Sequence, residues 1–240
     1  MSAETPSVNI GNAFSIFSEE PSWMKKSLIV GLCVLIPIAG PFQLLGYQHR
    51  CYNHAKAGNK GMPDSSLGED IGVGFFDWLK NLANMFPMMI LILTVFFGCS
   101  FGPALLAGGA QAASGSEEPN ALVGIVALMG VVLGYGFLFV ASLFVGVLAI
   151  DMNRRIYNGE TFPLFSPGGT IGAIKRNPGA FVMAWLGMML AGLVGAAGVI
   201  LCYFGALLTL PVSFAIRTKV LAQWDAVVQA NMPAEVEASY

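Results

Sequence analysis

The chain has 240 residues, of which 55% are hydrophobic and 11% charged, and its formal net charge is −2. Soluble domains carry about 25% charged residues, so this composition excludes an ordinary soluble protein. The small negative charge also argues against nucleic acid as a partner, because general nucleic-acid binding requires a basic face. Four long windows contain no charge of either sign: 27–48, 81–116, 119–150 and 177–216. Each could form a helix across a hydrocarbon core about 30 Å thick, which needs roughly 20 residues. The sequence therefore predicts an all-α, polytopic membrane helix bundle.

The N-terminal segment, residues 1–22, lacks the apolar core that marks a signal peptide. Within it, residues 12–17 predict either a short helix lying in the headgroup layer or a disordered tail. We expect a single transmembrane domain to occupy residues 23–216 and a C-terminal tail to occupy residues 217–240.

The first predicted span, residues 23–47, is interrupted by the segment Pro37–Pro41. A kink or break is expected there, because proline removes a helical hydrogen bond and clashes with the preceding turn. A single crossing would put Lys25 and Lys26 on the side opposite to the next polar segment, whereas a re-entrant bend would keep them on the same side. The 22 uncharged residues 27–48 are too few for two crossings, so we expect a single crossing.

Three more spans are predicted at about 81–107, 121–150 and 178–216, which gives four long spans. The last uncharged stretch, 177–216, has 40 residues. As a straight helix it would be about 60 Å long, at 1.5 Å per residue. That is twice the thickness of the hydrocarbon core. Either one helix projects beyond the lipid, or the chain folds back near residues 195–198 and makes a fifth span.

The distribution of basic residues predicts the orientation. The polar segments 48–80 and 151–177 hold eight of the 12 Lys and Arg residues, whereas the link 111–120 holds none and carries Glu117 and Glu118. Two spans separate the polar segments, so these segments share one side of the membrane. The positive-inside rule makes that side the cytoplasm and places the link outside.

The two halves of the chain contain a probable repeat. Arg50-Cys51-Tyr52-Asn53 ends the first span, and Arg155-Ile156-Tyr157-Asn158 ends the third. In both halves a Gly, a Pro, another Gly, a basic residue and an Asn follow before the next span. This order predicts a duplicated helix hairpin, arranged as a parallel repeat.

Residues 17–81 carry a resemblance to a known family. The residues that carry it are Pro21, Trp23, Lys25, Lys26, Gly46, Tyr47, Arg50, Gly58, Met62, Pro63, Gly74 and Lys80. This stretch resembles the small prokaryotic membrane proteins grouped as domain of unknown function 4013. The chain departs from the family pattern at Met62, where the family has Leu, and it lacks a Trp that follows there. The resemblance implies a multi-pass protein of the prokaryotic cytoplasmic (inner) membrane, and it implies no activity.

The sequence contains no recognisable catalytic, nucleotide-binding or EF-hand motif, and we predict no enzyme, no cofactor and no metal. His49 and His54 are five residues apart, a spacing that places them poorly on one helix face. Hydrogen bonding at the interface is therefore favoured over a metal or haem site. Arg50, Arg154 and Arg155 are candidate contacts for lipid headgroups, unless they serve only to orient the protein.

Small residues recur four positions apart in the predicted spans, a spacing that lets helix backbones approach closely. The candidates for helix packing are Gly98, Gly102, Gly130, Gly134, Gly187, Ala191 and Gly195. They could pack within the chain or against a partner.

Three hypotheses about function follow. The first is a non-catalytic membrane subunit or scaffold that contacts lipid and packs against other membrane protein subunits, as in a respiratory, photosynthetic or transport complex. The second is a transporter or channel-like protein for a small neutral solute, with a path lined by groups such as Gln43, Ser142 and Thr209. The third is a lipid-acting membrane enzyme that uses carboxylates such as Asp64 and Asp151. The uncharged windows of the predicted spans contain no Asp, Glu, Lys, Arg or His, which argues against proton coupling and favours the first hypothesis.

Overall fold

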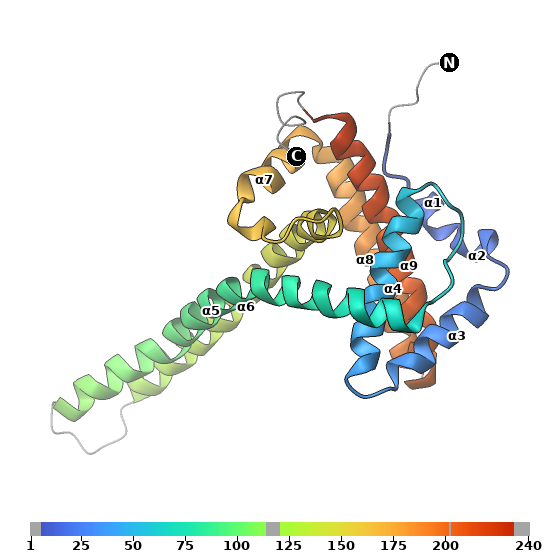
Figure 1. Ribbon diagram of the computed structural model, residues 1–240. Coiled ribbons are helices and arrows are strands. Elements are labelled where there is room, and N and C mark those ends of the chain that lie inside the picture. Colours follow the sequence, from blue (N-terminus) through green and yellow to red (C-terminus); the bar gives the residue numbers. More distant parts are fainter. Residues whose placement is uncertain (1–5, 114–120, 202, 233–240) are drawn as a thin grey trace. The chain divides into compact units, whose positions relative to one another are not determined.

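The computed structural model describes residues 6–113, 121–201 and 203–232, and this part of the chain consists of helices and connecting loops without a strand (Figure 1). The helices are α1 (Ile10–Phe14), α2 (Ile16–Glu19), α3 (Trp23–Val34), α4 (Ala39–Lys56), α5 (Leu67–Ala113), α6 (Ala121–Tyr157), a 3₁₀ turn (Pro163–Phe165), α7 (Pro167–Arg176), α8 (Pro178–Leu201) and α9 (Tyr203–Ala230). The predicted all-α class is confirmed. The predicted link at Glu117 and Glu118 lies outside the described residues.

Four helices are long and apolar enough to cross a membrane: Leu67–Gly109, Val123–Tyr157, Pro178–Ile200 and Gly205–Ala230. The prediction of a multi-pass helix bundle is therefore confirmed. The four helices are not the four predicted spans, however. Residues 23–47 are not among them, and the stretch 178–216 contributes to two.

The chain divides into two compact units. Unit 1 comprises Met1–Asn81 and Ile150–Tyr240, and unit 2 comprises Leu82–Ala149. All 12 Lys and Arg residues of the sequence fall within the ranges of unit 1. Unit 2 therefore carries no basic residue, and its only charged residues are Glu117 and Glu118 in the link between its two apolar stretches.

Unit 2 is an antiparallel pair formed by the apolar parts of α5 and α6. Gly130 lies against the carbonyl oxygens of Cys99 and Ser100, and Gly134 lies against the side chains of Ser100 and Phe96. The rings of Phe96 and Tyr135 meet edge to face with centroids 5.7 Å apart. Small residues on α6 thus allow the two helices to approach closely, as such residues do in membrane helix pairs.

The predicted first span is not one helix, and the expected single crossing is wrong. Helix α3 ends at Val34 and α4 begins at Ala39, with Ile38 between them at φ +66°. The chain reverses direction here. The evidence is a contact between the two open ends: the Nζ of Lys26, near the start of α3, lies 2.6 Å from the carbonyl oxygen of Met62, which follows α4. The physical cause is the proline pair around this turn, which cannot continue a straight helix.

The stretch 178–216 is also two helices, α8 and α9, which pack against each other along their length. The hydroxyl of Ser213 donates to the Ala191 carbonyl at 2.6 Å, and that of Thr209 donates to the Gly195 carbonyl at 3.2 Å. Gly198 and Gly205 face each other beside the reversal. The alternative of a fold-back is correct, and the reversal lies a few residues beyond the predicted position.

Both predicted tails belong to the packed body of unit 1 where they are described. Ala13 and Ile16 are buried, and the Asn9 amide donates to Gln223 Oε1 at 2.7 Å. Helix α9 continues to Ala230, with Trp224 fully buried. Apolar residues three apart on the N-terminal segment explain the docking, because they give its short helices one side that can pack on α9.

Candidate functional site

The polar core of unit 1 centres on Asp225 of α9. Its carboxylate accepts from Arg154 Nη1 at 3.0 Å, Asn158 Nδ2 at 2.9 Å and Gln229 Nε2 at 2.7 Å, and Lys56 Nζ lies 3.2 Å away. These donors come from α4, the C-terminal part of α6 and the following residue, and α9. One buried carboxylate therefore ties three segments that are far apart in the sequence.

Arg154 links Asp225 to a second buried carboxylate. Its Nε donates to Asp151 Oδ1 at 2.7 Å, and the Trp224 indole N–H donates to the same oxygen at 3.2 Å. Asp151 and Asp225 are almost fully buried, and Asp151 Oδ2 has no hydrogen-bond partner. Burying charge is costly unless the charges are paired and hydrogen-bonded. Two acids and two bases, counting Lys56, make this network neutral and explain how the fold tolerates it.

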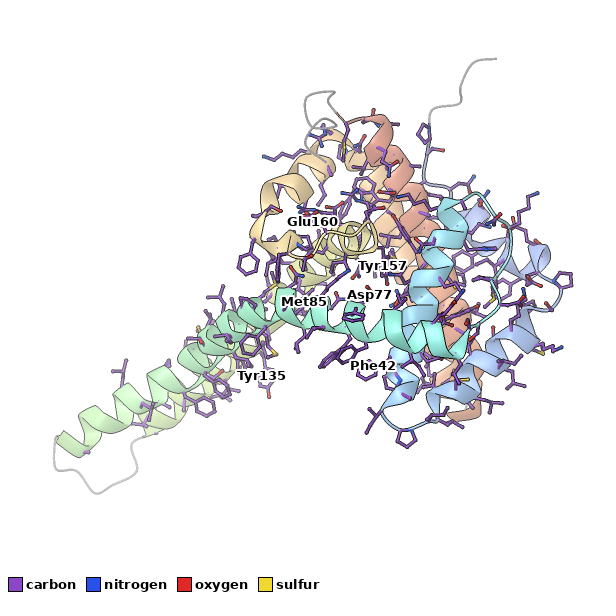
Figure 2. All side chains as sticks on the ribbon, in the orientation of Figure 1. Phe42, Asp77, Met85, Tyr135, Tyr157 and Glu160 are labelled. Carbon is purple, nitrogen blue, oxygen red and sulfur yellow. The ribbon has the colours of Figure 1, made fainter. Side chains whose placement is uncertain are left out.

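An aromatic and imidazole cluster continues the polar core. His49 Nδ1 lies 2.6 Å from Asp77 Oδ2, and the His49 ring packs on Tyr157 with centroids 5.0 Å apart. Figure 2 shows Asp77 and Tyr157, the two residues that His49 contacts. The Tyr52 ring lies tilted against the Tyr157 ring at 5.1 Å, and the Tyr52 hydroxyl accepts from Asn158 at 3.1 Å. His49 thus contacts the Asp77 carboxylate and the Tyr157 ring.

Arg50 and Arg155 occupy equivalent positions in the repeat and make equivalent contacts. Arg50 Nε donates to Asp70 Oδ1 at 2.7 Å, and Arg155 Nη1 donates to Thr170 Oγ1 at 3.1 Å. Asp70 and Thr170 lie 100 positions apart, within segments 63–72 and 163–172 that share Pro, Ser, Gly, Ile and Gly at five of ten positions.

This second stretch of identity supports the duplication. The sequence prediction missed it, although a search for a fixed offset of 100 would have found it. Tyr52 and Tyr157, whose rings are in contact, are themselves equivalent members of the repeat, so the two copies meet at matching positions.

The arginines predicted to contact lipid headgroups are engaged within the protein. Arg154 and Arg155 are buried, and Arg155 donates to Glu160 and to the carbonyls of Pro163 and Ser166. Their guanidinium groups are thus paired within the chain, and lipid contact by either residue stays a prediction. Arg50 is partly exposed and also pairs with Glu69 at 2.8 Å. Among the described residues, no group of three or more His, Cys, Asp and Glu could hold a metal ion.

The predicted small-residue positions divide into two sets. Gly130 and Gly134 lie at the helix contact of unit 2, and Gly187 and Gly195 face Val220 and Ser213 of α9. The Ala191 carbonyl accepts from Ser213. The predicted packing does not extend to Gly98 and Gly102, where an added Cβ would have no neighbouring atom within 4 Å.

Two cavities of about 520 and 430 Å³ are lined by residues of the Asp225 network. Residues lining the first include Arg154, Arg155, Glu160 and Gln229, and those lining the second include Lys56, Lys219, Glu19 and Asp225. In the second, Lys219 and Ser15 donate to Glu19 and lower the pKa of that carboxyl to about 2, although burial opposes the shift. The charges around these cavities are thus largely neutralised by each other.

Candidate catalytic and transport groups are likewise occupied. Asp64 is 90% exposed and pairs with Lys26, whereas Asp151 is buried. Gln43 donates to Ser65, and the hydroxyls of Ser142 and Thr209 donate to backbone carbonyls of their own or a neighbouring helix. Each of these groups therefore has a contact within the chain, although the buried oxygens Gln43 Oε1 and Asp151 Oδ2 have no hydrogen-bond partner.

Long apolar helices and a paired polar core define a polytopic α-helical membrane protein. Residues 29–204, most of the chain, match the family described as protein of unknown function (DUF4013), and the chain belongs to that family. The match extends well past the resemblance at residues 17–81 and includes both copies of the repeat. No curated protein and no solved structure matches the chain.

Proposed function

We propose that this protein is a non-catalytic integral membrane subunit or scaffold that packs against other membrane proteins. The observation that carries the proposal is the exposure of unit 2. Only 6% of the most apolar window of α5 and 11% of that of α6 is buried within the chain. Exposed side chains such as Phe86, Leu91, Leu105 and Leu106 offer a large surface to lipid and to neighbouring helices.

Gly98 and Gly102 support a protein neighbour on α5. They lie four residues apart on a helix, with open space at both positions in this chain. A small-xxx-small pair lets another helix approach closely. The two glycines that do not serve packing inside the chain are thus suited to packing against a partner.

The pairing of charges in unit 1 supports a structural role over a catalytic one. Arg50, Arg154 and Arg155 are each bonded to a carboxylate. Breaking such pairs during a reaction cycle would expose uncompensated buried charge. We further propose that the protein resides in the cytoplasmic membrane of a prokaryote, with its basic unit on the cytoplasmic side, as the positive-inside rule favours.

The test is purification of the tagged full-length chain from native membranes in mild detergent. A photo-crosslinking residue at Leu105 would report what lies beside α5. We expect a crosslinked membrane protein, and we expect the double variant Gly98→Leu/Gly102→Leu to lose it while inserting normally. The matched control is Gly136→Leu on α6, where the position is also open. If the chain is isolated alone, and in liposomes moves a solute or consumes a lipid, the proposal is wrong.

A further inference from the structure

We propose that α3 and α4 form a re-entrant hairpin that enters the bilayer from the side of the basic residues and turns within one leaflet, with lipid acyl chains around its tip. This inference depends on membrane placement of the chain and is independent of the proposed role as a subunit.

The apolar parts of the hairpin are too short to cross. On α3 the uncharged residues run from Ser27 to Val34, and on α4 the residues before the polar Gln48 run from Ala39 to Tyr47. At 1.5 Å per residue these parts are about 12 and 14 Å long. A hydrocarbon core of about 30 Å is twice that depth, so the tip can reach no deeper than the midplane.

Charged residues hold both open ends of the hairpin at the same side. Lys26 pairs with Glu20 at 2.8 Å and with Asp64 at 3.3 Å, and Asp64 belongs to the loop that follows α4. Arg50, near the end of α4, pairs with Asp70 at 2.7 Å. Ion pairs with partly exposed members are favourable at the aqueous boundary and costly in hydrocarbon. The ends therefore stay at one surface while the tip points away from it.

Aromatic residues mark a level near that boundary. Phe42 meets the rings of Phe75 and Trp78 of α5 at 5.5 and 5.6 Å, and Figure 2 shows Phe42 beside α5. Phe75, Phe76 and Trp78 are exposed. Aromatic side chains, Trp above all, are enriched where hydrocarbon meets water. With this aromatic cluster near the boundary, the turn and the residues that flank it are the part of the hairpin that lies deeper in the lipid.

The surface of the tip is apolar. Leu35, Ile36 and Ile38 are exposed at the turn, with Ile38 81% exposed, and Leu28 and Leu32 are exposed on α3 above it. In water this ridge would be an unfavourable apolar projection. Lipid acyl chains can cover the exposed sides of this ridge without any specific contact.

The backbone of the tip is also suited to hydrocarbon, where an unbonded N–H costs several kcal/mol. The amides of Leu35, Ile36, Ala39 and Gly40 all donate to carbonyls between residues 32 and 37. Residues 37 and 41 are prolines and have no N–H to satisfy. Of the seven residues 35–41, six therefore present no free amide to lipid.

The experiment uses the full chain in proteoliposomes of one orientation, with Cys33, Cys51, Cys99 and Cys202 replaced by Ala. Single cysteines are then placed by Lys25→Cys, Ile38→Cys and Lys60→Cys. We expect an impermeant maleimide to label positions 25 and 60 from the same side and position 38 from neither side. We also expect an environment-sensitive fluorophore on position 38 to be quenched by lipids brominated near the chain end.

Each other outcome overturns the proposal. Labelling of position 38 from the side opposite to position 60 would mean that the hairpin crosses. Labelling from the same side would place the tip in water. Protection from labelling without quenching by brominated lipid would mean that protein covers the tip.

Discussion

At the residue scale, the fold depends on buried charges whose partners are distant in the sequence. Asp225 accepts from Arg154 and Asn158, about 70 positions earlier. The spacing of Asp151 and Arg154, three positions apart, could be read from the sequence. The pair of Arg154 with Asp225 could not, because an ion pair between α6 and α9 leaves no local spacing to detect. Lipid contact by Arg154 and Arg155 stays a prediction, and the fold adds that both arginines are paired with carboxylates.

Asp225→Asn tests the importance of this network. The substitution removes the charge that Arg154 and Lys56 share while keeping the shape of the side chain. Leaving one member of a buried pair uncompensated costs about 3–5 kcal/mol, so we expect a clear drop in the thermal unfolding midpoint in detergent. Glu69→Gln is the control, because Glu69 is exposed and its pair with Arg50 should contribute little to stability. Equal midpoints for the two variants would contradict this account.

At the element scale, the sequence revealed where the helices break but not always what the break does. The prolines at 37 and 41 indicated a kink, and Lys25 and Lys26 favoured a reversal. The length argument prevailed because it assumed that a reversing chain must cross twice. A hairpin of two short helices satisfies both the charge pattern and the length. In the stretch 177–216, length alone indicated the fold-back between α8 and α9.

Substitutions at Gly74 and Gly72 of α5 test how closely α4 and α5 cross. A Cβ at Gly74 would overlap the carbonyl oxygen of Phe42, whereas a Cβ at Gly72 would meet nothing within 4 Å. Gly74→Ala should therefore force the helices apart and destabilise unit 1 by about 1–3 kcal/mol. Gly72→Ala should be neutral or stabilising by about 0.5–1 kcal/mol, because alanine favours helix. The measurement is the thermal unfolding midpoint of both variants in the same detergent. An unchanged midpoint for Gly74→Ala would show that α4 and α5 do not cross this closely.

At the scale of the whole molecule, the sequence analysis predicted a single transmembrane domain at residues 23–216, whereas the structure divides the chain into two units. The absence of Lys and Arg between residues 80 and 154 corresponds closely to unit 2, Leu82–Ala149. Hydropathy treated residues 1–22 and 217–240 as tails, because short amphipathic helices and a helix with Arg217 and Lys219 do not look like spans. Their docking on each other, through Lys219 and Glu19 at 2.7 Å, is a tertiary contact that no local pattern encodes.

The orientation of the whole chain is the last prediction. With α3–α4 and α8–α9 both folded back, the N-terminal helices and the end of α9 lie together in unit 1, joined by Asn9 and Gln223. We therefore expect both ends and every basic residue on the cytoplasmic side, since the positive-inside rule opposes their export. Green fluorescent protein fused at either end should fluoresce, and alkaline phosphatase should be active only when inserted after Ser116. The control is alkaline phosphatase inserted after Lys60, which should be inactive. Active phosphatase at the N-terminus would mean that residues 23–47 cross the membrane once, and activity after Lys60 but not Ser116 would invert the orientation.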